Sequence, residues 1–288
     1  MKTLTLTLLF ILILGYTIPG MFAEQKARLG NNAALRYWAA FSEMQDWAIT
    51  EEQAKQINGI LEGSVAYDDS QYGQVVKKNE FALELMARGT ALANCDWGLD
   101  YELGDNTPVE HVRNALKLGR FNVLDAYHLA SIGDKDGAVK ALIVGLHFSR
   151  DVATGGSLFA TIVAKDLLVE HFVAIESLQH MARFSPAQLT AVRNAVARLG
   201  PEGLDWESAM RLEMAILNRP EWQRNVPLSA VTQAYVVALQ DPSTLPKLKQ
   251  LLASVPLPLR DVIPSPKEVV EQKQEFEHNL QHIRRVLR

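Results

Sequence analysis

The residue types best suited to acid–base chemistry lie together in one apolar segment of the chain. Glu170 and His171 are adjacent, and Asp166 lies about one helical turn before Glu170. Carboxyl and imidazole groups transfer protons near neutral pH, and an apolar environment raises the pKa of a carboxyl group toward that range. With His147 from the preceding segment, these residues are the catalytic candidates of the sequence. A structural ion-pair network is the alternative interpretation.

A charge buried in an apolar helix needs a partner. The glycine pair at 155–156 predicts a tight turn that folds the preceding helix back along the helix of Glu170. That turn would bring His147, Arg150 and Asp151 within reach of the glutamate. We therefore expect its partner to come from these three residues.

A second candidate site is the long segment 94–106, which has large side chains and no helical pattern. Trp97, Asp100 and Tyr101 are its candidates for ligand binding. Its acidic residues supply oxygen ligands of the kind that calcium prefers, but their spacing does not fit an EF-hand loop. They are Asp96, Asp100, Glu102 and Asp105. The alternative is that the tryptophan and the tyrosine plug one end of a helical stack.

Two histidines near the C-terminus have the spacing of metal ligands on a helix. His278 and His282 are four residues apart, and Glu275 precedes the first by three, as in half of a carboxylate-bridged di-iron motif. On a helical wheel the apolar residues occupy the opposite side. These are Phe276, Leu280, Ile283 and Leu287. We therefore expect exposed histidines, no metal or cofactor, and an apolar stripe that packs on its own domain or on a second chain.

Composition narrows the possible functions further. The chain has 288 residues, is 48% hydrophobic and has a formal net charge of -4, so it can bury a core without disulfides or metal and has no electrostatic drive toward nucleic acid. Cys95 is the single cysteine, which excludes an intrachain disulfide. The sequence contains no nucleophile elbow, phosphate-binding glycine loop, His-Glu-x-x-His or Cys-x-x-Cys motif. The common hydrolases, nucleotide enzymes and zinc proteases are therefore disfavoured.

Residues 1–23 have the layout of a secretory signal peptide. Lys2 is their single charge, an apolar run covers 4–14, and Pro19 breaks the pattern shortly before a cleavage position near Ala23. An uncleaved membrane anchor is the alternative, because about 20 apolar residues can span a bilayer. We expect export to the periplasm or the cell exterior, with membrane contact only through this segment if it is retained.

Four segments carry the chemistry of a helix start. In each, a hydroxyl is expected to accept a hydrogen bond from the amide three residues later, and in three of them proline occupies a position that needs no donor. The segments are Thr50-Glu51-Glu52-Gln53, Thr107-Pro108-Val109-Glu110, Ser185-Pro186-Ala187-Gln188 and Ser265-Pro266-Lys267-Glu268.

Apolar residues between these starts recur every three or four positions, which predicts helices and no sheet. The expected helices cover 31–48, 51–62, 70–93, 108–131, 136–153, 157–182, 186–199, 202–217, 229–240, 243–253 and 266–287. Short connections require consecutive helices to pack antiparallel. The expected fold is an all-α array of antiparallel helical hairpins in a single domain over 24–288, with a sub-boundary near 183–186, and the apolar helix 157–182 at its centre.

The segment 125–150 resembles a tetratricopeptide-type hairpin. Small residues, a turn glycine and a large apolar residue fall at the positions of that motif: Ala126, Gly133, Ala138, Leu142 and Gly145. The stretch 95–178 is similar to a group of exported helical proteins of environmental bacteria. It shares with them a Cys-Asp-Trp loop, a Gly-Asp hairpin and a Gly-Gly turn before a long apolar helix. These resemblances imply a helical fold and an export route, and no activity.

Three functions are compatible with these observations. The first is a scaffold of the cell envelope whose concave surface binds a peptide or another envelope protein. The second is an enzyme that uses the acid–base residues of the apolar helix. The third is a carrier with an apolar pocket between helices, and a structure should distinguish them by the shape and polarity of the site.

Overall fold

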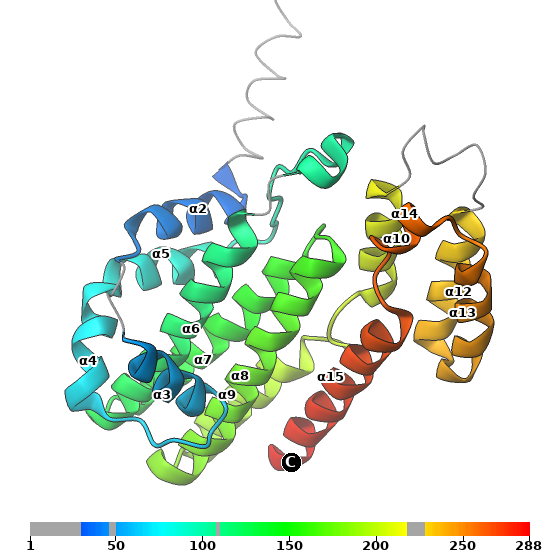
Figure 1. The fold of residues 1–288 in the computed structure, drawn as a ribbon. Helices are drawn as coiled ribbons and strands as arrows, with labels where there is room; N and C mark the ends of the chain where they lie inside the picture. The colour runs from blue at the N-terminus through cyan, green and yellow to red at the C-terminus, as the bar shows by residue number, and fades with distance from the viewer. Residues whose placement is uncertain (1–29, 46–49, 108–109, 218–227) are drawn as a thin grey trace, which may run out of the picture.

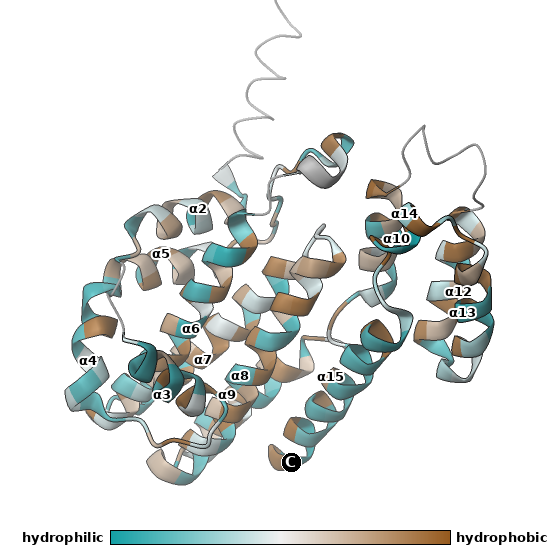
Figure 2. Ribbon diagram, in the orientation of Figure 1, coloured by the Kyte–Doolittle hydropathy of each residue, from teal (hydrophilic) through white to brown (hydrophobic). Residues whose placement is uncertain are grey.

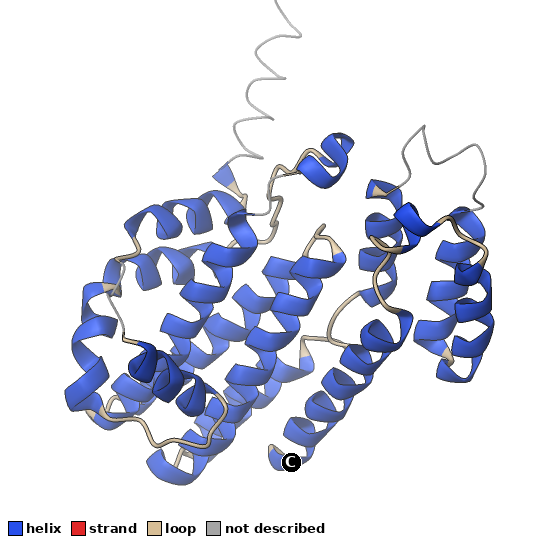
Figure 3. Cartoon of the chain, in the orientation of Figure 1, coloured by secondary structure: helices blue, strands red, loops and turns tan. Residues whose placement is uncertain are grey.

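A computed structural model describes residues 30–45, 50–107, 110–217 and 228–288 of the chain. Throughout these residues the fold is built from helices and contains no strand, which confirms the predicted all-α class (Figure 3). No helix among them is long and apolar enough to cross a membrane. The predicted signal peptide at 1–23 lies outside the described residues.

Thirteen α-helices are described. They are α2 (Ala33–Glu43), α3 (Glu51–Leu61), α4 (Asp69–Lys78), α5 (Glu80–Thr90), α6 (Glu110–Ser131), α7 (Lys135–Ala153), α8 (Leu158–Ala182), α9 (Pro186–Ala197), α10 (Trp206–Ile216), α12 (Leu228–Gln240), α13 (Leu245–Ala253), α14 (Leu257–Arg260) and α15 (Pro266–Val286). Two short 3₁₀ helices, η1 (Tyr101–Asn106) and η2 (Pro242–Thr244), join them. The turns between α6, α7 and α8 are short, and the three helices run antiparallel to their chain neighbours (Figure 1).

Helix starts follow the predicted chemistry at two of the four positions. Thr50 and Ser185 each form a complete capping box with the glutamine three residues later. Ser265 makes no such bond, so the prediction was wrong there. The Thr107 hydroxyl donates to the carbonyls of Asp100 and Gly104, and the helix start predicted there includes 108–109, which lie outside the described residues.

One predicted helix is interrupted. The segment 70–93 was expected to be continuous, but it divides into α4 and α5 at Asn79. The buried Asn79 amide donates to the carbonyls of Val75 and Gln45, and its oxygen accepts from the Gln45 amide. A side chain that bonds to backbone groups competes with the helix in this way, so the chain turns at this residue.

The layer formed by α6, α7 and α8 is the centre of the fold, as the distribution of apolar residues predicted. Buried side chains of α8 point to several sides of the helix, because α6, α7, α10 and α15 all contact it. Glycines allow the close approach of its neighbours: a Cβ at Gly119 would lie 2.5 Å from a Leu167 methyl group, and a Cβ at Gly145 would lie 1.8 Å from Nε2 of His171. The absence of side chains at these two positions therefore sets the spacing of the layer.

The C-terminal helix α15 packs on its own chain, against α8, α9, α12 and α13. Its apolar stripe is buried, and Phe276 stacks on Phe172 of α8 with ring centroids 6.4 Å apart. Most of the remaining positions are hydrophilic, as Figure 2 shows. The apolar stripe of α15 therefore packs on helices of its own chain, which was the first of the two interpretations.

Candidate ligand-binding site

Glu170 pairs with a different residue from those the sequence suggested. Arg120 of α6 donates to its Oε1 from Nε at 3.0 Å and from a terminal nitrogen at 2.8 Å. Burial raises the pKa of Glu170, and the Arg120 guanidinium opposes that shift. His147, Arg150 and Asp151 form no ion pair with it among the described residues, because α8 directs this position toward α6 rather than toward α7.

His171 is fully buried between α6, α7 and α8. Its Nδ1 lies 2.6 Å from the Leu167 carbonyl oxygen, and its Nε2 lies 3.0 Å from the side chain of Asn122. Burial lowers its pKa to about 4, so the ring is neutral at pH 7. A neutral imidazole has one N–H, which Nδ1 donates to Leu167. The Asn122 atom nearest Nε2 is Oδ1, so a hydrogen bond to Nε2 requires the amide to be turned so that its nitrogen donates. These contacts give His171 a structural role.

The other two acid–base candidates lie in separate surroundings. Asp166 is 44% exposed at its side chain and pairs with the buried Lys165 ammonium at 2.7 Å. His147 has a buried Nε2 without a hydrogen-bond partner, and burial followed by the charges of Arg150 and Arg198 lowers its pKa. Glu170 differs from these two in having a cationic partner, Arg120, that lines a mainly apolar cavity.

The tryptophan of the 94–106 segment is buried at the end of the helical stack. Trp97 stacks on Phe41 and donates from its indole nitrogen to the Asp151 carbonyl oxygen at 2.9 Å. Tyr101 donates to the Gly155 carbonyl oxygen, and the Asp100 carboxylate caps η1. These three residues are engaged within the protein, which favours the plug interpretation over ligand binding.

The buried Asp151 carboxylate accepts hydrogen bonds from two residues at this end of the helical stack. Its Oδ2 accepts from the Tyr37 hydroxyl at 2.6 Å, and its Oδ1 accepts from Arg150 at 3.2 Å. Nearby, the ring of His111 lies against Trp97 with centroids 4.8 Å apart, and neither of its nitrogens has a hydrogen-bond partner. Burial lowers the pKa of His111 to about 4.

The two C-terminal histidines are exposed, as the helical wheel predicted. His282 Nε2 lies 3.2 Å from Glu176 of α8, and no group of three possible metal ligands occurs within the described ranges. His282 therefore contributes a surface contact between α15 and α8.

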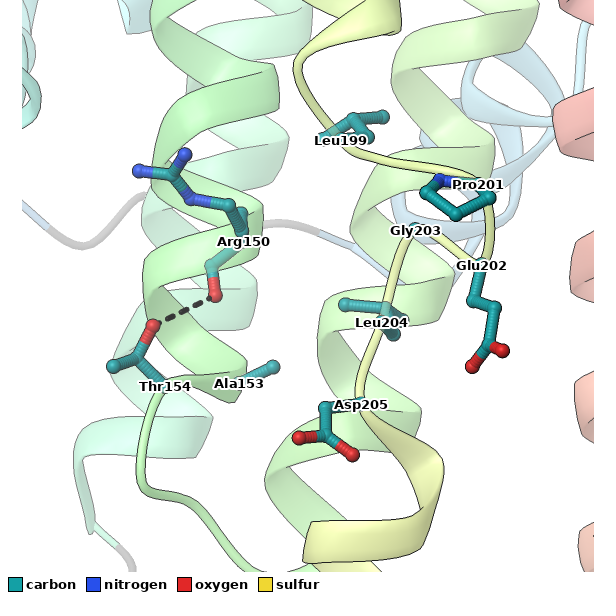
Figure 4. Close-up of a pocket in the computed structure, with 9 residues that line it drawn as sticks. All are labelled: Arg150, Ala153, Thr154, Leu199, Pro201, Glu202, Gly203, Leu204 and Asp205. Carbon is teal, nitrogen blue, oxygen red and sulfur yellow. Dashed lines mark hydrogen bonds between the residues drawn. The ribbon is translucent and has the colours of Figure 1, made fainter.

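A cavity of about 420 Å³ opens between the end of α7 and the loop that precedes α10 (Figure 4). Its charged lining residues have both signs: Arg150, Glu202 and Asp205. The Asp205 carboxylate already caps α10 through the Ser208 amide, and the Thr154 hydroxyl donates to the Arg150 carbonyl, as the dashed line shows. This mixture of charges selects no particular class of ligand.

A second cavity has a more distinctive lining. It measures about 340 Å³, lies between α3 and α6, and is called the α3–α6 pocket below. Its residues are Ala54, Ile57, Asn58, Arg113, Leu116, Lys117, Arg120, Phe121 and Leu124. Most of this surface is apolar, and the three charged side chains are all cations on α6.

The sequence contains part of the signal for this pocket. Positions 113, 116, 117, 120 and 124 follow the spacing of one helical face, so cations alternate with apolar residues along α6. The opposite wall comes from α3, more than fifty residues earlier in the chain. Sequence spacing alone does not reveal that these two helices face each other.

A third cavity of about 290 Å³ lies against α5, α6 and α7, and has acidic and basic residues among a mainly apolar lining. Glu80, Asp125 and Lys140 are among its charged residues, and burial raises the pKa of Asp125 to about 6. Asn122 also lines it and connects it to the buried His171. His171 itself does not line this cavity.

Comparison of the chain with protein-family models, curated proteins and solved structures finds no match.

Proposed function

We propose that the protein binds a small molecule with an apolar body, held in the α3–α6 pocket. The observation that carries the proposal is a cavity of about 340 Å³ whose walls are formed mainly by aliphatic and aromatic side chains. Small-molecule sites are concave, mostly apolar and typically about 300–1,000 Å³ in volume. Phe121 and Leu124 are buried at its base, and the exposed Arg113 lies at its rim.

The acid–base enzyme has less support from the structure than this carrier. The four acid–base candidates do not meet in one site, and His171 is completely buried inside the protein. Substrate contact requires a general base within hydrogen-bond reach of a cleft. If the chain is exported, as we propose from residues 1–23, the ligand would be bound in the periplasm or outside the cell.

The experiment uses N-phenyl-1-naphthylamine, a neutral probe whose fluorescence rises in apolar surroundings. We expect saturable binding at one site. Ala54→Phe fills the pocket from α3 and should weaken the affinity by about tenfold or more, which corresponds to about 1.4 kcal/mol. Lys55→Phe places the same side chain at the adjacent exposed position and should leave the affinity unchanged.

Circular dichroism and the urea midpoint confirm that both variants are folded. Binding that does not saturate, or an equal affinity in the two phenylalanine variants, would show that the pocket is not the site.

A further inference from the structure

The rim of the α3–α6 pocket is positively charged. Arg113, Lys117 and Arg120 are spaced by four and three residues, so they share one face of α6. None of the described residues that line the pocket is acidic. An apolar floor beside cations is complementary to a molecule with an apolar body and one anionic group.

Arg120 belongs both to the pocket and to the ion pair with Glu170. Its side chain is 37% exposed, whereas that of Glu170 is 12% exposed. Nε and a terminal nitrogen of Arg120 both bond to Oε1 of Glu170, and the buried Oε2 has no hydrogen-bond partner among the described residues. A guanidinium has five N–H donors, so Arg120 retains donors that a ligand can reach from the pocket side.

We propose that the ligand of this pocket is an anionic amphiphile whose acidic group takes Arg120 from Glu170, and that Glu170 binds a proton when this happens. The inference rests on the proposed function, since it concerns the same pocket. The exchange replaces the pair between Arg120 and the Glu170 carboxylate by a pair between Arg120 and the anionic group of the ligand, and Glu170 takes up one proton from solution. The occupant is a single molecule rather than a lipid surface, because the site is a concave cavity of limited volume.

The proton follows from the charges that face Glu170. Among the described residues, burial raises the pKa of Glu170 most, Arg120 lowers it, and the carboxylates of Asp166 on α8 and Glu62 at the end of α3 raise it further. Once Arg120 pairs with a ligand, Glu170 is buried beside like charges and its ionised form is strongly disfavoured. Ligand affinity should therefore increase as the pH falls, by up to about tenfold per pH unit for one proton taken up.

Two matched probes separate the charge of the ligand from its apolar body. The first is 8-anilinonaphthalene-1-sulfonate, which remains anionic between pH 5.5 and 8, and the second is N-phenyl-1-naphthylamine, which has the same ring system without the sulfonate. We expect the purified protein to bind the sulfonate at least about tenfold more tightly than the neutral probe at pH 6. Only the affinity for the sulfonate should depend on pH.

Three variants test the individual steps. Arg120→Gln should lower the sulfonate affinity by about tenfold or more and leave the neutral probe within about twofold. Glu170→Gln, which mimics the protonated side chain without a buried charge, should bind the sulfonate tightly at every pH. Arg211→Gln removes an exposed arginine of α10 as the matched control and should change neither probe.

The outcomes distinguish the two proposals. If neither probe binds in the pocket, the proposed function fails. If the neutral probe binds as tightly as the sulfonate, the pocket stands and the anionic ligand is refuted. If the sulfonate is preferred but its affinity does not change with pH, or if Glu170→Gln retains the dependence of the parent, the exchange with Glu170 is refuted. Glu170→Gln keeps the test decisive should Arg120→Gln fail to fold.

Discussion

Gly145→Ala should destabilise the protein strongly, because this glycine faces the most crowded point of the α6–α7–α8 layer. An added Cβ would lie 1.8 Å from Nε2 of His171 and 2.4 Å from Oδ1 of Asn122. Both distances are far below van der Waals contact, and both neighbouring side chains are buried. The ring and the amide must therefore move, and the hydrogen bond between them is lost.

The expected magnitude combines three effects. Alanine in place of glycine favours a helix by about 1 kcal/mol. Forcing an extra methyl group into a packed core costs about 1–3 kcal/mol, and buried polar groups left without partners cost about 1–3 kcal/mol more. The central values leave a net loss of about 3 kcal/mol in the free energy of unfolding. Urea denaturation followed by circular dichroism measures this quantity.

A double-mutant cycle with His171→Ala identifies the cause. In the His171→Ala background the ring is absent and Asn122 can turn away, so Gly145→Ala should cost less than about 1 kcal/mol or even stabilise the helix. A penalty of the same size in both backgrounds would refute the steric explanation. So would a Gly145→Ala variant with the stability of the parent protein.

Three further substitutions probe other buried contacts. His111→Leu should stabilise the protein by about 1–3 kcal/mol, because neither ring nitrogen has a partner. Burial lowers the pKa of His111 to about 4 in the folded protein. As the pH falls, His111 is therefore protonated in the unfolded chain before it is protonated in the folded protein, which destabilises the parent. The difference in the free energy of unfolding between His111→Leu and the parent, measured with urea, should therefore grow between pH 6.5 and 4. A constant or negative difference would contradict this. Tyr37→Phe removes the 2.6 Å bond to Asp151 and should cost about 1–3 kcal/mol, whereas an unchanged urea midpoint would mean that Arg150 alone satisfies the carboxylate. Phe276→Ala should cost about 3–5 kcal/mol by calorimetry, and a loss below about 1 kcal/mol would show that α15 is not docked on α8.

Local chemistry explains which parts of the fold could be predicted from the sequence. The capping boxes at Thr50 and Ser185 depend on residues three positions apart, and the helices that they begin start where expected. The central position of α8 followed from apolar residues on most of its sides. By contrast, Asn79 interrupts a helix through bonds to Gln45 and Val75. One of those partners is distant in sequence, so the interruption has no local signal.

The partner of Glu170 shows why side-chain pairing could not be derived in the same way. Neighbouring residues on a helix point about 100° apart, so Glu170 and His171 contact different residues of α6, Arg120 and Asn122, although they are adjacent in sequence. A helix that is buried on most sides has several possible partners for each charge. The tight turn correctly placed α7 beside α8, but the direction of each side chain depends on how α6 packs on the same helix.

The pocket depends on the same unpredicted contact. Arg120 pairs with Glu170 of α8 and also lines the cavity between α3 and α6, so the same guanidinium can reach a ligand. A buried carboxylate whose single cationic partner is shared in this way is costly unless the protein gains something from it. Buried ion pairs can often be replaced by uncharged residues without loss of stability, whereas an exchange of Arg120 between Glu170 and a ligand requires both charges. Comparing the pH dependence of the sulfonate affinity of Glu170→Gln with that of the parent therefore tests whether the ion pair exchanges with a ligand.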